Sequence, residues 1–530
     1  ACGGGSVRDG KTINIKAYRG GYGTTWLYRL AEEFERVYAD EGYKVNILRP
    51  DNSLVGNAAL SEMRLGSDKS GIDIIFTQSV EVMNAIDEEY GVCVENLSEM
   101  YAKPAISFDG SEEDQPISAK LPSSYDGAVK AGDDYYAMLY ASSPSGMVAN
   151  TAVLREYGLE LPRTTRELFH CYDVIYNGNG NKAGSAETGV YPFAWAGSNA
   201  YGYALFQLYT YLGQTLGRTE YDRFMTLQKG EEITQEDIDN GKEVYDQDAV
   251  FEPVELLMRQ FNTRTSVPGS IQDTHDEAHY SVLMGTAAFI PDGEYFYSEA
   301  KVNYEDYLSD IVFLNTPVNS SLGVTLKLDG SGTDEARCDE ILSYLISLYD
   351  AGKSAEEMIA GAASEYGVTL KKEQVDRVAE ARGCYYERLD HCAYIVAGTK
   401  VKPIAELFLR MAASDDFGDL FNETAYAYAP YSGRNSYEGD DPFIRSVFEV
   451  VGRRDAWSVS NLNVGGLRKA ANISLYEPYG VEIVRQISQT GCLFDGSGTA
   501  DFISQRTTIR NKINEVWGDK MEAAGYHVSD

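Results

Sequence analysis

Hydrophobic and polar positions divide the first hundred residues into five regular elements. Short apolar runs predict strands at "TINIKAY", "YKVNIL" and "GIDIIFTQ". Between the first two strands, "TTWLYRLAEEFERVYADEG" places Leu27, Leu30, Phe34 and Val37 on one helical face, after a Thr cap and before Gly42. "NSLVGNAALSEMRLG" predicts a second helix. This βαβαβ order, with a third strand that is apolar throughout, predicts an α/β fold with a mostly parallel sheet flanked by helices.

The same mixture continues further along the chain. "DDYYAMLYASSPSGMVANTAVLREYGLELPRTTRELF" predicts a strand, an extended crossover, a second strand and a helix that begins at Pro-Arg-Thr-Thr. "SVLMGTAAFIPDGEYF" predicts a helix end, an apolar strand and a turn, and "KPIAELFLRMAASDDFGDLFNETAYAYAPYS" predicts two helices broken near Ser414. The tail "TADFISQRTTIRNKINEVWGDKMEAAG" predicts an amphipathic helix that ends at Gly525.

Three loops follow the predicted parallel strands and mark the expected ligand edge of the sheet. They are Arg19 to Gly23, Pro50 to Ser53 and Thr77 to Ser79. Ligands of open α/β sheets bind at the carboxyl ends of the strands, so we expect these loops to line a binding site.

The length and charge of the chain indicate a globular protein of at least two lobes that does not bind nucleic acid. A chain of 530 residues is too long for one core, so we expect at least two lobes. Hydrophobic residues make up 43% and charged residues 24%, which is typical of a globular protein. The net charge of −35 repels phosphate backbones and excludes nucleic acid as an expected partner. No apolar run approaches the roughly 20 residues of a membrane span.

The first residues, "ACGGGSVRDG", place a cysteine before three glycines. A glycine run favours a flexible tether, and a small residue followed by cysteine is typical of the cleavage point of a bacterial lipoprotein, whose cysteine receives the lipid. We therefore expect Cys2 to be lipidated at the end of a tether over residues 1–10. The alternative is that Ala1 is a cloning scar and Cys2 an exposed thiol.

The order of these segments resembles the extracellular solute-binding proteins of carbohydrate-type ABC importers, the maltose-binding-like group. The matching segments are "INIKAYRGGYGTTWLYRLAEEFE", "VNILRPDNS", "GIDIIFTQS", "DDYYAMLYASSPSGMVANTAVLREYGLELPRTT", "GTAAFIPDGEYF" and "KVKPIAELFLRMAASDDFGDLFNETAYAYAP". The resemblance implies a type II periplasmic-binding-protein-like fold of two α/β lobes, with the ligand trapped between them as they close. It also implies a lipid-anchored monomer at the outer face of a Gram-positive cell membrane.

The resemblance implies discontinuous lobes. We expect lobe 1 to comprise residues 11–141 and 315–410, and lobe 2 to comprise residues 142–314 and 411–530. Residues 328–391 look like a mostly helical insertion, where the family is usually tighter.

The resemblance also implies which residues bind the ligand. The expected ligand-binding residues are Arg19, Tyr22, Asp51, Thr77, Gln78, Ser142, Tyr191, Trp195, Asp292 and Tyr295. Polar side chains and aromatic faces of this kind match the hydroxyl edges and C–H faces of a sugar. Trp195 fits a core position equally well, and we expect Trp26 to pack within the protein.

Metal sites and disulfides have weaker support. "HDEAH" spaces His275 and His279 four apart, but the protease pattern needs Glu where Asp276 stands, so we expect a solvated helix. "DGSGTDEARCDE" resembles a calcium loop, but Asp334 replaces the required glycine and a tight turn is expected. Seven cysteines occur without a CxxC pair. We expect no metal and no cofactor, and "CYYERLDHC" leaves a Cys384–Cys392 bridge open.

The resemblance implies capture of a sugar, in particular an oligosaccharide, and its delivery to an ABC permease, without catalysis. The alternatives are a secreted glycan hydrolase that uses a carboxylate pair and a surface glycan-docking protein. The chain has no Gly-x-Ser-x-Gly elbow and no phosphate-binding glycine loop with a lysine.

Overall fold

The computed structural model describes residues 10–529 apart from residues 88, 199–200, 231, 246–247, 432–436, 461–464, 474–510 and 512–513. The chain divides into two compact units. Unit 1 comprises Ala1–Pro144, Glu294–Asn303 and Arg388–Asp440. Unit 2 comprises Ser145–Gly293, Tyr304–Glu387 and Asp441–Asp530. Cys2 lies outside the described residues.

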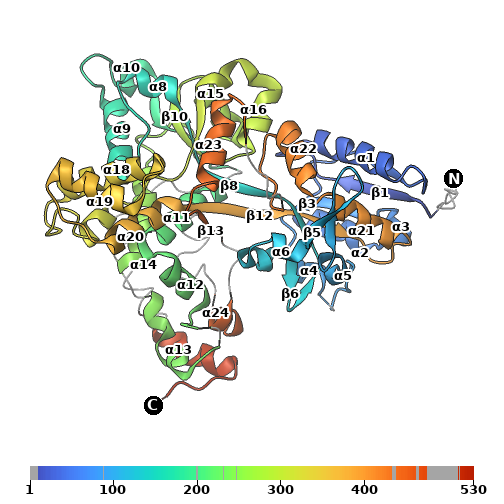
Figure 1. Cartoon of the computed structure of the whole chain (residues 1–530). Coiled ribbons are helices and arrows are strands. Elements are labelled where there is room, and N and C mark those ends of the chain that lie inside the picture. The colour runs from blue at the N-terminus through green and yellow to red at the C-terminus, as the bar shows by residue number, and fades with distance from the viewer. Residues whose placement is uncertain are drawn as a thin grey trace. The chain divides into compact units, whose positions relative to one another are not determined.

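Unit 1 begins with the predicted βαβαβ segment (Figure 1). Its strands are β1 (Thr12–Ala17), β2 (Lys44–Ile47), β3 (Ile74–Gln78), β4 (Pro104–Ile106), β5 (Glu112–Pro116), β6 (Lys130–Ala131) and β7 (Asp134–Tyr135). Its helices are α1 (Thr25–Val37), α2 (Gly56–Arg64), α3 (Ser67–Ser70), α4 (Val82–Ala85), α5 (Ser98–Tyr101), α6 (Ile117–Lys120), α7 (Asp126–Val129), α21 (Lys402–Met411) and α22 (Asp415–Ala425). Strands β8 (Met138–Asn150) and β12 (Cys384–Ile395) and helix α16 (Phe296–Tyr304) belong partly to each unit.

The sheet of unit 1 confirms the expected parallel arrangement and adds one antiparallel strand. β1 pairs in parallel with β2, where Ile13 faces Val45, and in parallel with β3. On its other side β3 pairs with β12 in antiparallel fashion, which places His391 opposite Gln78. The loops after β1 and β3 therefore meet residues that arrive from far along the chain.

Helix α1 covers the core of unit 1 together with α22. The Trp26 ring stacks on Tyr140 at 5.2 Å and meets Phe421 edge-on at 5.6 Å. Trp26 is buried, which confirms its expected packing role. Helix α1 ends at Val37, earlier than the predicted end at Gly42, and Gly42 has a positive φ of 73° in the turn before β2.

Unit 2 is richer in helices. Its strands are β9 (Tyr191–Phe193), β10 (Ala287–Gly293), β11 (Ile311–Leu314) and β13 (Trp457–Val459). Its helices are α8 (Thr151–Glu156), α9 (Thr165–Asn177), α10 (Ser185–Thr188), α11 (Ala204–Leu216), α12 (Arg218–Thr226), α13 (Gln235–Asn240), α14 (Asp248–Gln260), α15 (His275–Leu283), α17 (Ser321–Thr325), α18 (Glu335–Asp350), α19 (Ala355–Tyr366), α20 (Lys372–Gly383), α23 (Pro442–Val451) and α24 (Gly466–Ala470).

Three strands of unit 2 join β8 in one sheet, and β13 pairs in parallel with β12. β10 and β11 each pair with β8 in antiparallel fashion, and β9 pairs with β10 in parallel. The predicted strand, crossover and strand around residue 144 form the single strand β8. The helix start predicted at Pro-Arg-Thr-Thr is confirmed, because Thr164 and Glu167 form a capping box at α9.

The tail is described only in part. Residues 514–523 are helical and precede Gly525, whereas most of the N-terminal part of the predicted tail helix lies outside the described residues. The break predicted near Ser414 is confirmed, because the Ser414 side chain caps α22.

The two units differ from the expected lobes in four stretches. Residues 315–387, expected in lobe 1, group with unit 2. Residues 142–144, 294–303 and 411–440, expected in lobe 2, group with unit 1. Helices α18, α19 and α20 pack on one another around a core that includes Leu342, Met358 and Val378 (Figure 1). The Arg377 guanidinium donates to the carbonyl groups of Gln214 and Thr215 at the end of α11. These contacts explain why the helices of the predicted insertion belong to unit 2. The end of the insertion is not helical, because residues 384–391 lie in strand β12, and residues 388–391 belong to unit 1.

Candidate functional site

A polar and aromatic cluster lies in unit 1, where the loop after β1 meets β8 and β12 and the chain that follows β10. We call it the unit 1 polar cluster. It comprises Tyr18, Tyr22, Ser143, Glu294, Tyr295, Arg388, Asp390 and His391. Because every member belongs to the same compact unit, the geometry of the cluster can be described directly.

Tyr22 and Glu294 form the buried base of the cluster. The Tyr22 hydroxyl lies 2.5 Å from Ser143 Oγ and donates to Glu294 Oε1 at 2.9 Å. The other carboxylate oxygen, Oε2, accepts from the Tyr428 backbone N–H at 3.1 Å. Burial, together with the charge of Glu294, raises the pKa of Tyr22 well above its ordinary value. Tyr22 therefore stays a protonated donor that positions Glu294.

Arg388 and Asp390 form a charged pair beside this base. Arg388 Nη2 donates to Asp390 Oδ2 at 2.5 Å, and Ser79 Oγ donates to the same oxygen at 3.1 Å. Burial alone would raise the pKa of Asp390, but Arg388 and His391 hold it well below its usual range. Arg388 also lies 5.6 Å from the centre of the Tyr295 ring, with Nη1 3.4 Å from the Tyr295 hydroxyl. A fixed cation, a carboxylate and an aromatic ring are thus held together.

His391 carries a hydrogen-bonding atom that no described residue of the cluster uses. Its Nδ1 lies 3.0 Å from Asp390 Oδ1, and its ring packs edge-on against Tyr22 at 5.0 Å and Tyr140 at 5.6 Å. The side chain is 1% exposed, and no residue that the structure describes forms a hydrogen bond with its Nε2. A Cβ on Gly21 would lie 3.7 Å from this nitrogen, so the loop after β1 passes close to it. Nε2 is therefore a polar atom that neighbouring side chains leave unsatisfied.

The outer edge of the cluster is polar and partly exposed. Tyr18 is partly buried, and burial followed by the charge of Glu299 raises its pKa. Arg19 is exposed, and the side chains of Arg388 and Asp390 keep about a fifth of their surface accessible. Phenol, guanidinium and carboxylate groups are the polar anchors that hydroxyl-rich ligands use, and Tyr18 adds a flat aromatic face.

The structure brings some of the predicted ligand residues of unit 1 to this cluster. Tyr22 and Tyr295 are members of it, Gln78 pairs with His391 across the sheet, and exposed Arg19 lies between Tyr18 and Gly21. Thr77 is buried, and its hydroxyl donates to the Leu54 carbonyl at 2.7 Å. Thr77 therefore holds the loop after β2.

Asp51 and Ser142 occupy different surroundings. Asp51 pairs with Tyr18 as an isolated parallel bridge, and its carboxylate accepts from the backbone and side chain of Ser53, each at 2.8 Å. Ser142 lies in β8 and is buried, and its hydroxyl has no hydrogen-bond partner. Asp51 shapes a turn, whereas the Ser142 hydroxyl is a further buried polar atom of unit 1 that no described residue satisfies.

The remaining predicted ligand residues belong to unit 2. Tyr191 lies in β9 and is partly exposed. Trp195 is buried in the unit 2 core, with its ring 5.6 Å from Phe261. Asp292 is fully buried, and its carboxylate lies 2.6 Å from His279 Nε2. The sequence allowed Trp195 either a core position or a ligand-binding position, and the structure places it in the core.

Sequence reasoning missed six of the eight members of the unit 1 polar cluster, since only Tyr22 and Tyr295 were predicted. The missed members with charge or a titratable ring are Glu294, Arg388, Asp390 and His391. The sequence places "RLDH" at the end of the predicted insertion and between two cysteines, and neither feature points to a binding site. Its signal is that Arg388 and Asp390 stand two apart, which puts both side chains on one face of a strand.

The possible metal sites do not assemble in the described part of the chain. Its side chains form no group of three or more His, Cys, Asp or Glu that could hold a metal ion. His279 is bonded to Asp292 in the protein interior, so the expected solvated helix is exposed only in part. Asp329 accepts backbone N–H groups from Ser331 and Gly332, as expected of a tight turn before α18.

The described cysteines are buried free thiols. They are Cys93, Cys171, Cys338, Cys384 and Cys392. Cys384 and Cys392 lie eight residues apart in the single strand β12, a separation of about 26 Å at the usual rise per residue. A disulfide needs Cα atoms within about 7 Å, so the bridge that the sequence left open does not form.

Among the described residues, no helix is both long enough and apolar enough to cross a membrane. No protein-family model and no curated protein sequence matches the chain.

Among solved structures, the chain is similar to a chitin oligosaccharide binding protein, with 13% identity and a TM-score of 0.55 over 97% of this chain and 99% of that chain. It is also similar to the solute-binding protein RafE solved with raffinose, at 12% identity and a TM-score of 0.55 over 96% and 99% of the two chains. A third similar structure is the ABC substrate-binding protein Lmo0181 from Listeria monocytogenes in complex with cycloalternan, at 12% identity and a TM-score of 0.54 over 96% and 99%. These likenesses extend over almost the whole chain and confirm the fold predicted from the sequence.

Proposed function

We propose that this protein captures a sugar, in particular an oligosaccharide, and delivers it to the permease of an ABC importer. The observation that carries the proposal is the shared fold over 97% of the chain with a protein described as binding chitin oligosaccharides. Structures named for raffinose and cycloalternan binding are similar over 96% of the chain. Ligands of these proteins are neutral and rich in hydroxyl groups.

The unit 1 polar cluster is the part of the sugar site that we assign. Tyr18 supplies an aromatic face, and Arg388 and Asp390 supply a donor and an acceptor for sugar hydroxyls. Tyr22 and Glu294 lie beneath and position the residues above them. Because Arg388 and Asp390 neutralise each other, the edge favours a neutral ligand.

The other predicted residues differ in how accessible their side chains are to a ligand. Arg19 is exposed beside Tyr18, and Tyr191 in unit 2 is partly exposed, so both side chains are accessible. Trp195 and Asp292 are buried in unit 2, and their part is to support the surrounding backbone. Closure of two lobes around the ligand, with closed forms gaining contacts that open forms lack, belongs to the proposal as the resemblance implies it.

The cellular setting is also proposed. We propose an extracellular, monomeric receptor, attached through a lipid on Cys2 to the outer face of the cytoplasmic membrane. Two or more acyl chains anchor a protein firmly, because each buried CH₂ contributes about 0.8 kcal/mol. The net charge of −35 supports docking of acidic surfaces to the permease.

Thermal unfolding against a panel of mono- and oligosaccharides tests capture. Ligand that binds only the folded protein stabilises it by about 2.7 kcal/mol at a hundredfold excess over Kd, so one family of sugars should raise the midpoint. The supernatant is analysed for shorter sugars after each incubation. New shorter sugars would contradict capture without catalysis, and a panel without any shift would contradict sugar binding.

A matched pair of tyrosine variants tests the position of the site. Tyr18→Ala removes the aromatic face of the cluster and should weaken sugar binding at least tenfold, because stacking and burial of one aromatic ring contribute about 1.5–3 kcal/mol. Tyr28→Ala removes an exposed ring from α1 in the same unit and should leave Kd unchanged. Equal affinities of the two variants would place the sugar elsewhere.

A further inference from the structure

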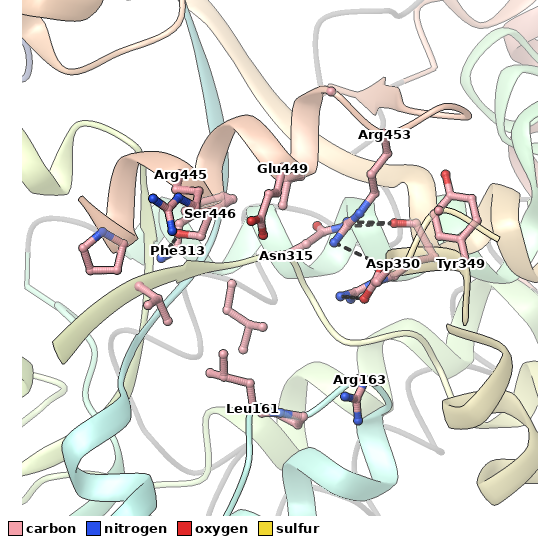
Figure 2. A pocket seen from close by; sticks show the side chains of 18 of the residues that line it. Leu161, Arg163, Phe313, Asn315, Tyr349, Asp350, Arg445, Ser446, Glu449 and Arg453 are labelled. Atoms are coloured by element: carbon pink, nitrogen blue, oxygen red, sulfur yellow. Dashed lines mark hydrogen bonds and ion pairs between the residues drawn. The ribbon is translucent and has the colours of Figure 1, made fainter. Parts of the chain in front are cut away.

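A second candidate site is a cavity of about 700 Å³ that lies entirely within unit 2. Helix α23 forms one wall and presents Ser446 and Glu449, and the segment with Leu161 and Arg163 lies on the opposite side (Figure 2). Its volume is within the range of small-molecule pockets, about 300–1,000 Å³. The cavity therefore has room for a complete small metabolite.

Positive charge dominates the lining of this cavity. Five arginines line it, against two carboxylates. The arginines are Arg163, Arg382, Arg445, Arg453 and Arg454. The protein as a whole carries −35, so this surplus of cations is local and opposite to the average. Cations taken out of water are costly unless anions pair with them, so the cavity favours an anionic occupant.

One carboxylate serves the two most deeply placed guanidinium groups. Arg382 binds Asp350 through Nε at 3.0 Å and Nη2 at 2.7 Å. Arg453 Nη2 lies 3.5 Å from the same carboxylate, and its Nη1 donates to the Arg382 carbonyl at 3.2 Å (Figure 2). Burial, followed by the neighbouring charge of Arg382, lowers the pKa of Arg453 to about 9. The protein thus leaves this pair of cations short of negative charge.

Two buried polar atoms of the lining have no hydrogen-bond partner among the residues that the structure describes. Arg382 is 6% exposed, and its Nη1 forms no hydrogen bond. Asn315 is 2% exposed, and although its Nδ2 donates to the Arg382 and Cys384 carbonyls, its Oδ1 accepts nothing. Buried polar groups are normally satisfied, so each unpartnered atom needs an explanation. One atom is a donor and the other an acceptor.

Arg163 adds a further cation at the edge of the cavity. Its side chain is partly exposed, and in the part of the chain that the structure describes no carboxylate forms an ion pair with its guanidinium. The charge of Arg163 still acts on Asp350, whose pKa is held low mainly by Arg382 against the effect of burial. Leu161, Val312 and Val450 make another part of the lining apolar.

We propose that the unit 2 cavity binds a small hydroxylated organic anion, of the sugar phosphate or sugar acid class. Its phosphate or carboxylate accepts hydrogen bonds from Arg382 Nη1 and Arg163, and one of its hydroxyl groups donates to Asn315 Oδ1. The C–H face of the ligand lies against the apolar lining. This site is separate from the sugar site proposed in unit 1, and neither depends on the other.

Calorimetric titration of the full chain tests the proposal with four probes. Glucose 6-phosphate and glucuronate represent the two anion classes, inorganic phosphate lacks the hydroxyl groups, and glucose lacks the charge. We expect glucose 6-phosphate or glucuronate to bind, with affinity that falls as NaCl is raised. Whichever of the two binds more tightly identifies the anionic group. If inorganic phosphate binds as tightly as glucose 6-phosphate and glucuronate, the sugar hydroxyl groups contribute nothing. That result would overturn the proposed role of Asn315.

A charge-matched pair of variants locates the binding. Arg163→Gln should weaken anion binding at least tenfold with little loss of stability, because its guanidinium has no ion-pair partner to lose. Arg155→Gln removes an exposed arginine of the same unit, paired with Asp310, and should leave anion affinity unchanged. No binding by either organic anion, or equal affinities in the two variants, would overturn the proposal. A failure to bind neutral sugars would leave it intact and count only against the unit 1 site.

Discussion

The unit 1 polar cluster and the unit 2 cavity differ in how their buried charged side chains are paired. In unit 1, Arg388 and Asp390 pair with each other at 2.5 Å, and Glu294 is held by Tyr22 and by the Tyr428 backbone. In unit 2, the single carboxylate of Asp350 faces both Arg382 and Arg453. The Arg388–Asp390 pair carries no net charge and stands beside one further buried carboxylate, Glu294, whereas the lining of the unit 2 cavity is cationic.

This difference indicates which ligand each region favours. A balanced set of donors and acceptors exchanges hydrogen bonds with neutral hydroxyl groups without leaving a charge uncompensated. A set with surplus guanidinium groups gains most from a ligand that brings negative charge. Net charge of the whole chain predicts neither preference, because both depend on a few side chains.

Loss of the carboxylate at the base of the unit 1 cluster should have the largest effect. Glu294→Ala leaves the Tyr22 hydroxyl and the Tyr428 N–H buried without their acceptor. Each hydrogen bond to a charged group contributes about 1.5–3 kcal/mol, so the free energy of unfolding should fall by roughly 3–6 kcal/mol. Urea denaturation measures it. Glu32→Ala, an exposed change in α1, should cost less than about 0.5 kcal/mol, and equal losses would contradict the buried role of Glu294.

Loss of the carboxylate in unit 2 should be comparably costly but recoverable. Asp350→Asn leaves Arg382 and Arg453 without their shared counter-charge, at a cost of about 3–5 kcal/mol. Added glucose 6-phosphate should recover part of the loss in the urea midpoint, because it supplies the missing negative charge. Asp310→Asn breaks an exposed pair with Arg155 and should cost under about 1 kcal/mol. A midpoint of Asp350→Asn that no anion restores would argue against a cationic cavity.

Removal of one hydroxyl group from the unit 1 cluster should have an intermediate effect. Tyr22→Phe keeps the ring but takes the donor from Glu294 Oε1 and the partner from Ser143, so we expect a loss of about 1–3 kcal/mol. Denaturant midpoints of this variant and of Tyr28→Phe, whose ring is exposed, give the comparison. A Tyr22→Phe protein as stable as the wild type would show that the hydrogen bonds contribute nothing.

The smallest expected effect is a difference in pH dependence between one aspartate of each unit. Arg388 and His391 hold the pKa of Asp390 below its unfolded value of about 3.9, so its contribution to stability is complete above that pH and is lost as pH falls below it. Burial raises the pKa of Asp339 in unit 2, so its carboxylate destabilises the fold as pH rises above about 3.9.

Urea midpoints at pH 3, 4.5 and 6 test these signs. The advantage of wild type over Asp390→Asn should shrink towards pH 3. The urea midpoint of Asp339→Asn should instead rise relative to that of the wild type as pH rises. The same direction for both variants would contradict the assigned environments.

Local sequence patterns determined most of the secondary structure. The apolar runs in "TINIKAY" and "GIDIIFTQ" form the parallel strands β1 and β3, and the Thr164 and Ser414 caps begin helices where they were expected. The binding residues were predicted less completely. Tyr22 and Tyr295 meet at 6.4 Å as members of one cluster, but Asp292 is occupied by His279 inside unit 2.

The sequence by itself determined the α/β fold, because hydrophobic periodicity and capping act over a few residues and can be recognised locally. Only the tertiary structure decided where the helical insertion packs and which charges share a cavity. Arg163, Asn315 and Arg382 come from three distant segments of the chain. Their common surroundings depend on long-range packing, which no local pattern encodes.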